Sequence, residues 1–286
     1  MKIEHPSQCK TCTIRNSSRG SGALAAITRF RYNRKLVAMQ SIVCKSLLIL
    51  FTITAASVHA NDISEQAIKA IRADDIATLE TVYRGLSNAN VATERGKTAL
   101  MIAAKYNKPE IVQSLLKNNA DVNVTNDNGG TALMYAAIPN SPQIINLLLE
   151  RGAVVNKKGV NGWSALMVAA AKGHAEVAQI LLDHGADVNT QDVYGWTPLM
   201  RSVWEQRSEV VERLLSHDAI DLDRKDEQGA TALHHAAARG NSELVKWLLQ
   251  HGAASEAKDF DGKTPIHRAL AMGHTAVIQV IRESVK

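Results

Sequence analysis

The four-residue sequence "TALM" occupies residues 98–101 and returns unchanged at residues 131–134. Related versions follow as "SALM" at 164–167, "TPLM" at 197–200, "TALH" at 231–234 and "TPIH" at 264–267. The step from one to the next is 33 residues, except for one step of 34. A fixed period of this length predicts a solenoid, in which similar units stack against one another.

Each unit also carries its own signals for helix boundaries. The Thr or Ser that opens the motif is a good N-cap, because its hydroxyl accepts from an early backbone N–H. Pro198 and Pro265 then occupy the first helical position, where no N–H is needed. Leucine pairs such as Leu181-Leu182 recur on a second helix. Each unit therefore reads as helix, turn, helix and hairpin loop, and its apolar face is buried only by stacking.

The period, the glycine two residues before each Thr or Ser, and "HGADVN" at 184–189 closely resemble the ankyrin repeat family over residues 61–286. The resemblance implies an all-α solenoid of helix-turn-helix units with hairpin loops, about seven repeats including the caps. We expect a single continuous domain and a monomer. The expected units are 61–93, 94–126, 127–159, 160–192, 193–226, 227–259 and 260–286.

The fourth position of the motif departs from the family pattern in most units. His234 and His267 stand where the family usually has a histidine that ties the hairpin to the helix. Methionine replaces it in the other units, which should therefore lack that bond. We favour a core-filling role for these methionines, because Met fits irregular gaps; the alternative is a stripe of ligands for soft copper ions. They are Met101, Met134, Met167 and Met200.

No arrangement of residues predicts catalysis. The sequence has no H-E-x-x-H, no G-x-S-x-G and no phosphate-binding loop. "KDFDGKT" at 258–264 is explained by the turn residues of a hairpin loop. His234 and His235 are adjacent, so they point to different faces of a helix and do not converge on a metal. We expect a binding protein that is not an enzyme and has no cofactor and no metal site.

In the family, partners usually meet the concave face, which is built from hairpin tips and the exposed side of each first helix. The matching positions of the middle units gather aromatic, apolar and arginine side chains. Such residues dominate binding hot spots, so we predict a protein-binding surface there. In the alternative, Trp163 and Trp196 only shield neighbouring hairpins from water. Hairpin tips should contribute little to the core. The predicted surface is Tyr135, Ile138, Trp163, Val168, Trp196, Arg201 and Trp204.

The basic charge of the chain comes from its first part. Residues 1–60 hold nine Lys or Arg and one acid, whereas residues 61–286 hold 24 bases and 27 acids, a formal charge of −3. The overall charge of +5 therefore says nothing about the repeats. With no basic stripe in the repeats, we expect no nucleic-acid partner.

Residues 39–60, "MQSIVCKSLLILFTITAASVHA", resemble a secretory signal peptide with a small-residue cleavage site at Ala60. The apolar run is too short for a comfortable membrane span, so we expect none after cleavage. Residues 1–38 then read as an upstream extension that is disordered or untranslated. If Met1 is the true start, this Arg- and Ser-rich segment reads instead as a mitochondrial transit peptide.

The functional expectation is a scaffold or adaptor in the periplasm of a Gram-negative bacterium, or secreted, that binds a protein partner. All three cysteines precede the expected cleavage, so the mature chain would suit an oxidising compartment. One alternative is a dedicated inhibitor or immunity protein that masks an exported enzyme. Another is a metal or redox-stress accessory protein that acts through its Met and His side chains.

We predict that the mature protein begins at Asn61, because signal peptidase should cleave after Ala60. N-terminal sequencing of the protein from a native cell fraction measures this directly. A cytosolic protein that begins at Met1 or Met39 would contradict the prediction.

Overall fold

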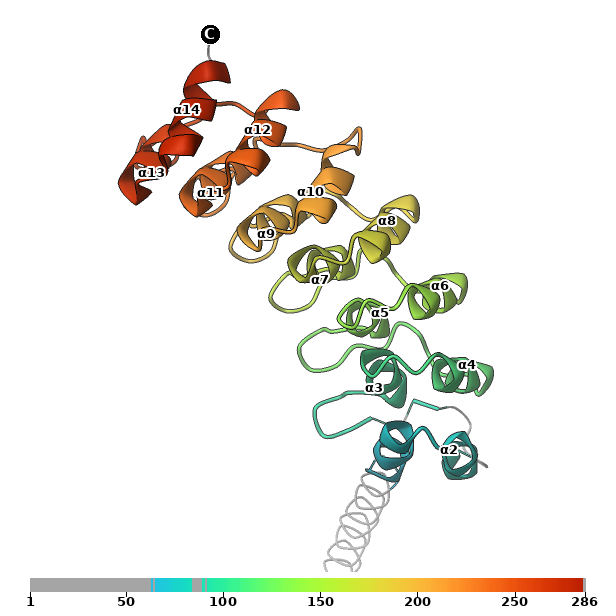
Figure 1. The fold of residues 1–286 in the computed structure, drawn as a ribbon. Coiled ribbons are helices and arrows are strands. Elements are labelled where there is room, and N and C mark those ends of the chain that lie inside the picture. The colour runs from blue at the N-terminus through green and yellow to red at the C-terminus, as the bar shows by residue number, and fades with distance from the viewer. Residues whose placement is uncertain (1–62, 64, 84–88, 91, 285–286) are drawn as a thin grey trace, which may run out of the picture. The chain divides into compact units, whose positions relative to one another are not determined.

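The computed structural model describes residues 63, 65–83, 89–90 and 92–284 (Figure 1). The chain divides into two units, residues 1–57 and 58–286, and every described residue lies in the second. The expectations for residues 1–38 and 39–60 fall outside the described residues. The described secondary structure is helical apart from one isolated bridge between Ala92 and Thr98, which confirms the all-α class.

The helices form two layers. The first layer consists of α3 (Ala99–Lys105), α5 (Ala132–Ala136), α7 (Ala165–Lys172), α9 (Pro198–Trp204), α11 (Ala232–Arg239) and α13 (Pro265–Met272). The second layer consists of α2 (Ile76–Tyr83), α4 (Pro109–Lys117), α6 (Pro142–Glu150), α8 (Ala175–Asp183), α10 (Ser208–Leu215), α12 (Ser242–Gln250) and α14 (Thr275–Ser284).

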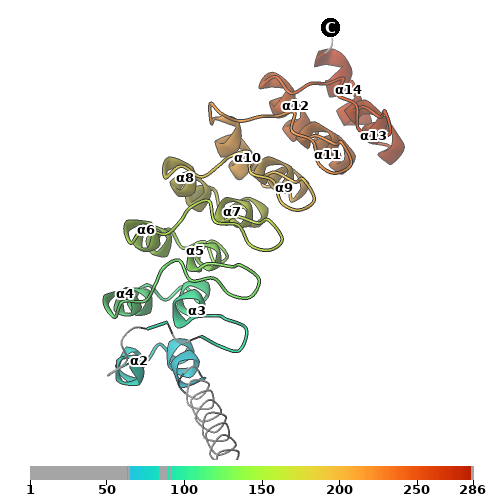
Figure 2. The same cartoon turned by 180° about the vertical axis from the view of Figure 1, so that it is seen from behind.

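Each first-layer helix is followed by its second-layer partner, and successive pairs stack in chain order (Figures 1 and 2). Helical residues 65–73 precede α2 and complete the first pair. The long hairpin loops extend from the side of the first layer, away from the second layer (Figure 2). This arrangement confirms the predicted solenoid of helix-turn-helix units.

The helix boundaries follow the predicted signals. In each Met-containing motif, the Thr or Ser hydroxyl accepts from the N–H of the Met three residues later; in α3 the Thr98–Met101 distance is 3.3 Å. Pro198 opens α9 as expected. Gly173 ends α7 with φ +85°, a left-handed conformation that costs glycine little. At the matching place after α9, Gln206 adopts the same region with φ +55°.

Small and branched apolar side chains fill the space between the two layers. Alanine pairs such as Ala169-Ala170 are fully buried and let neighbouring first-layer helices approach closely. Leu181 of α8 is also fully buried. The four motif methionines are buried as well, in agreement with the core-filling interpretation. The same core cluster runs through the units, so every unit depends on its neighbours.

Asparagine side chains tie each unit to the next one. Asn156 accepts from the N–H of Asp187 at 2.8 Å and donates to the carbonyl of Gly185 at 2.9 Å. These two bonds satisfy backbone groups at the end of the following second-layer helix, where helices otherwise leave them unpaired. Asn123 and Asn189 repeat the arrangement one unit before and one unit after. The Asn of the recurring Val-Asn dipeptide, at residues 123, 156 and 189, therefore links each unit to the next.

The two histidine-containing motifs have a capping bond that the methionine motifs lack, because each His accepts through Nδ1 from the N–H of its Thr. His234 accepts from the N–H of Thr231 through Nδ1, so Nε2 carries the proton and donates to the carbonyl of Lys263 at 3.1 Å. This bond joins α11 to the next hairpin, as the family resemblance implies. Burial lowers the pKa of His234, and the bond to Lys263 only partly opposes that effect. A second proton on the ring would remove the acceptor that Thr231 uses.

We predict that replacing Leu181 with Ala lowers the free energy of unfolding by about 2–5 kcal/mol, because the change leaves a cavity in the stack. Leu270→Ala is the matched control, since Leu270 is 51% exposed and should change stability by less than about 0.5 kcal/mol. Urea unfolding followed by circular dichroism measures both. Equal midpoints for the Leu181 variant and the wild type would contradict the stacking.

We also predict that stability falls as the pH drops from about 7.5 to about 5, partly through His234. Its folded pKa lies below its unfolded pKa, so the unfolded chain takes up the proton first and acid favours unfolding. His234→Met, which copies the other units, should reduce this loss. Urea midpoints at the two pH values test it, with the same change at exposed His267 as a control. An unchanged pH dependence in His234→Met would refute this role.

Candidate functional site

One side chain at the base of most hairpins performs two tasks. In the hairpin after α8, Asp192 accepts through one oxygen from the N–H groups of Tyr194 and Trp196, at 2.9 and 3.0 Å. Its other oxygen forms an ion pair with Arg201, nine residues further along on α9. The first oxygen shapes the hairpin, and the second fixes the hairpin to the helix.

The same nine-residue pairing recurs along the stack. In each case an Asp or Asn binds hairpin N–H groups two and four residues later, and also contacts the side chain nine residues later. These pairs were not predicted from the sequence, although an Asp or Asn stands at a constant spacing before a polar helix residue in these units. The further pairs are Asn126–Tyr135 at 2.9 Å, Asp226–His235 at 2.8 Å and Asp259–Arg268 at 2.6 Å.

Two carboxylates of these pairs titrate at lower pH than an ordinary Asp. Burial raises the pKa of Asp226, but the bonds from His235 and from two backbone N–H groups outweigh it, and the net shift is downward. For Asp259, burial again raises the pKa, while the bond and charge of Arg268 help to lower it overall. Both carboxylates therefore stay ionised and hold their helix partners well into mildly acidic solution.

Two hairpins lack this pair, and a hollow opens beside each of them. In the hairpin before α7, Gly159 and Val168 take the two places, so neither side chain spans the gap. In the hairpin before α3, Thr93 still accepts from the N–H of Lys97 at 3.1 Å, but Ile102 offers it no polar partner. Each hollow thus lies beside a hairpin that lacks the hairpin-to-helix pair.

The hollow beside Gly159 has a volume of about 220 Å³ and unites four residues of the predicted surface. Tyr135 and Ile138 contribute from α5 and the turn after it, Trp163 from the hairpin tip and Val168 from α7. Apart from these residues, the lining consists of amides, glycines and one methionine, with no charged side chain: Asn126, Asn128, Gly130, Met134, Gly159 and Asn161.

The other predicted residues form a stack that begins at the same tryptophan. The guanidinium carbon of Arg201 lies 5.0 Å from the ring centre of Trp163 and 4.4 Å from that of Trp196. Arg201 is therefore held between indole rings of two successive hairpins while Asp192 neutralises it. Cation–π contacts of this kind are typically worth about 0.5–2 kcal/mol each.

The stack continues toward the C-terminal units. The rings of Trp196 and Trp204 meet edge to face at 5.7 Å, and His235 lies 4.3 Å from Trp196. Beyond them, the guanidinium carbon of Arg239 lies 5.0 Å from the ring centre of Trp204. Together with the hollow, the stack brings all seven predicted residues into one continuous surface. Arg239 was not predicted from the sequence, because it lies at the end of α11, outside the hairpin tips and the exposed helix positions that the family uses.

Trp196 corrects the expectation that hairpin tips contribute little to the core. Its ring is only partly exposed, packs against the core cluster and lies between Arg201 and His235. Trp204 is the more accessible of this pair, with 37% of its surface exposed. Trp196 thus shields the neighbouring hairpins, whereas Trp204 is exposed to a partner.

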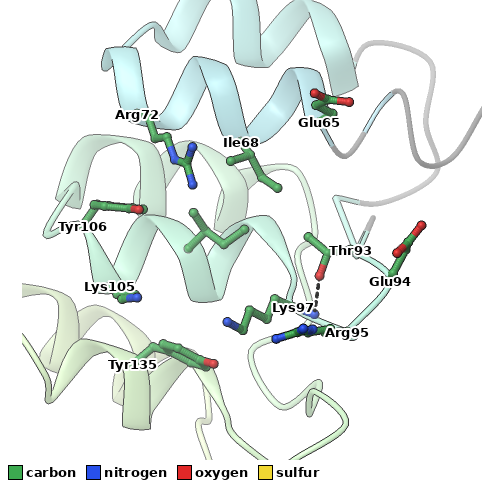
Figure 3. Close-up of a pocket in the computed structure, with 11 residues that line it drawn as sticks. Glu65, Ile68, Arg72, Thr93, Glu94, Arg95, Lys97, Lys105, Tyr106 and Tyr135 are labelled. Atoms are coloured by element: carbon green, nitrogen blue, oxygen red, sulfur yellow. Dashed lines mark hydrogen bonds between the residues drawn. The ribbon is translucent and has the colours of Figure 1, made fainter.

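The second hollow, of about 450 Å³, lies toward the N-terminal end of the described stack (Figure 3). It was not predicted from the sequence. Arg72 reaches it from helical residues 65–73, and Lys97 from the hairpin before α3, and both extend toward its middle (Figure 3). Tyr135 lines this hollow as well as the smaller one, so the two are adjacent. The remaining residues that line it are Glu65, Ile68, Thr93, Glu94, Arg95, Ile102, Lys105 and Tyr106.

The described residues contain no cluster of three or more His, Cys, Asp or Glu side chains arranged to hold a metal ion. In that same part of the chain, no helix is both long enough and apolar enough to cross a bilayer.

Comparison with known proteins bears directly on this arrangement. Residues 67–159 and 154–226 match a family described as "Ankyrin repeats (3 copies)", and residues 214–269 match "Ankyrin repeats (many copies)". A similar solved structure is the ankyrin repeat domain of Bcl-3, described as a unique member of the IkappaB protein family. It has a TM-score of 0.67 and 26% identity, over 76% of this chain and 97% of that one. No curated protein sequence matches significantly.

We predict that Trp196→Ala lowers the free energy of unfolding by about 2 kcal/mol, because it removes a ring that packs on both a cation and a neighbouring imidazole. Trp204→Ala should cost less than about 1 kcal/mol, since its ring lies at the surface. Urea unfolding measures both variants. If the two lose the same stability, the stack does not support the hairpin as described.

Proposed function

Because the chain belongs to the ankyrin repeat family, we propose that it is a non-catalytic scaffold that binds a protein partner on the surface formed by its hairpins and first-layer helices. Repeats of this family serve as protein-interaction scaffolds, and function must be argued from the particular surface. Here that surface is the 220 Å³ hollow and the adjoining tryptophan–arginine stack, whose residues are Tyr135, Ile138, Trp163, Val168, Trp196, Arg201 and Trp204.

The observation that carries the proposal is the apolar hollow between Tyr135 and Trp163. Both walls are held in place before any partner arrives, because Asn126 bonds to the hydroxyl of Tyr135 and Arg201 packs on Trp163. A partner side chain that enters the hollow would therefore not have to order its walls, which favours affinity. Aromatic anchors around a central hollow are typical of binding hot spots.

We propose further that binding takes place after export to the periplasm. Support comes from the sequence of residues 39–60, with a lysine ahead of a short apolar run and small residues at the expected cleavage site. The absence of cysteine after Cys44 is compatible with an oxidising compartment.

Site-specific photo-crosslinking in cells tests the proposal. A photoreactive amino acid at Val168, inside the hollow, should yield a protein adduct that mass spectrometry can identify. The same amino acid at Lys246, on the exposed side of α12, is the control and should not yield that adduct. Equal adducts from both positions, or none from Val168, would contradict binding at this surface.

We predict that Trp163→Ala and Trp204→Ala each weaken binding of the identified partner by about 2 kcal/mol, as expected for hot-spot residues. Trp247→Ala, on the second layer, should leave affinity unchanged. Calorimetry gives the affinities, and the thermal midpoint of each variant shows whether it is folded. Retained affinity in a folded Trp163→Ala/Trp204→Ala double variant would show that these rings only shield the hairpins.

A further inference from the structure

The larger hollow has a net positive lining, because four basic and two acidic side chains border it. It is lined by Arg72, Arg95, Lys97 and Lys105. None of these four takes part in the ion pairs formed among the described residues.

Cations elsewhere on the same face are treated differently. Arg201 and Arg268 lie on matching positions of α9 and α13, and each is paired with the Asp of its own hairpin. The hairpin before α3 has Thr93 at that place and Ile102 nine residues later, so this unit has neither member of the ion pair. The cations of the hollow thus lie outside both the hairpin-to-helix pairs and the other ion pairs of the described residues.

The two acids that line the hollow do not offset this charge at its centre. Glu65 and Glu94 lie together at one side, whereas Arg72 and Lys97 extend toward the middle (Figure 3). The local excess is also opposite to the charge of residues 61–286, which is −3. A positive hollow in an otherwise negative domain attracts anionic groups to one place and gives specificity to the encounter.

Tyr135 lies at the border between this charged hollow and the apolar one. Its ring lines both hollows, and the ammonium of Lys97 lies 5.9 Å from the ring centre. A ligand that crosses Tyr135 therefore passes from cations to an uncharged lining that ends at Trp163. The two hollows together are complementary to a peptide segment that carries acidic side chains next to an apolar side chain.

We propose, on the basis of the proposed function, that the partner binds through an acidic protein segment. Its Asp or Glu carboxylates occupy the hollow and pair with its four cations, Arg72, Arg95, Lys97 and Lys105. An adjacent apolar or aromatic side chain enters the hollow between Tyr135 and Trp163. Charge-assisted bonds to arginine and lysine supply recognition at the first hollow, and burial of apolar surface supplies it at the second.

A nucleic acid fits this groove less well. Its phosphates repeat at short regular intervals and need successive cations. The lining beyond Tyr135 contains no charged side chain, and the next cation, Arg201, is already paired with Asp192.

Fluorescence anisotropy with labelled peptides of equal length tests the inference on the purified protein. One peptide is glutamate-rich with a central phenylalanine, the second has serine in place of phenylalanine, and the third has glutamine in place of glutamate. We expect the first to bind at least about tenfold tighter than either of the others, and its affinity to fall as salt is raised. No preference for the acidic peptide would overturn the inference.

Paired variants assign the effect to the two hollows. Arg95→Gln with Lys105→Gln removes two exposed cations and should weaken the acidic peptide by about tenfold or more. Lys117→Gln with Lys246→Gln makes the same charge change on α4 and α12 and should alter affinity by less than about twofold. Val168→Tyr fills the apolar hollow and should abolish the preference for phenylalanine over serine. Equal losses in both charge variants would overturn the assigned site.

Two further outcomes distinguish an acidic peptide from a nucleic acid, and this inference from the proposed function. If single-stranded DNA competes as tightly as the acidic peptide and is lost in the same Arg95/Lys105 variant, the site is for nucleic acid and the inference fails. If the protein crosslinked through Val168 still binds fully to a folded Arg95→Gln/Lys105→Gln variant, the inference fails while the proposed function stands. Circular dichroism confirms that each variant is folded.

Discussion

The whole structure depends on one constraint: no single unit buries its own apolar face. A pair of helices of seven to nine residues, such as α7 and α8, has too little interior to be stable alone, so burial comes from the units on either side. This is why Ala169-Ala170 are small and Leu181 is fully buried. The repeat length follows from the same constraint, because every unit must present the same shape to the next.

A separate side-chain interaction attaches the hairpins to this stack. A single carboxylate, as at Asp192, shapes the loop with one oxygen and binds the helix with the other. In the units of Asp192 and Asp259, the carboxylate also neutralises an arginine of the helix. Where Thr93 or Gly159 replaces the carboxylate, the groove opens. The two hollows therefore lie beside the hairpins that lack the hairpin-to-helix pair.

The groove also changes in chemical character along the stack. Near α3 it is cationic, around Val168 it is apolar, and beyond Trp163 it is a closed stack of indole and guanidinium groups. The first two regions contain hollows of about 450 and 220 Å³, while the third holds neighbouring hairpins in register and exposes the ring of Trp204. This division explains why Trp163, at the border, has both a structural contact and a free hollow beside it.

The sequence by itself determined the repeating architecture. The period, the hydroxyl caps such as Thr98 and the left-handed glycines such as Gly173 are local or periodic features, and local backbone geometry is enough to interpret them. It also placed the seven surface residues on one face, because equivalent positions in a repeat share a direction. Only the tertiary structure decided how those side chains meet: that Arg201 lies between Trp163 and Trp196, that Trp196 is largely packed, and that Lys97 and Tyr135 border one charged hollow. The physical reason is that these contacts join different units. They depend on the distance between stacked hairpins and on which side chain fills each gap, and neither follows from the spacing of residues along the chain.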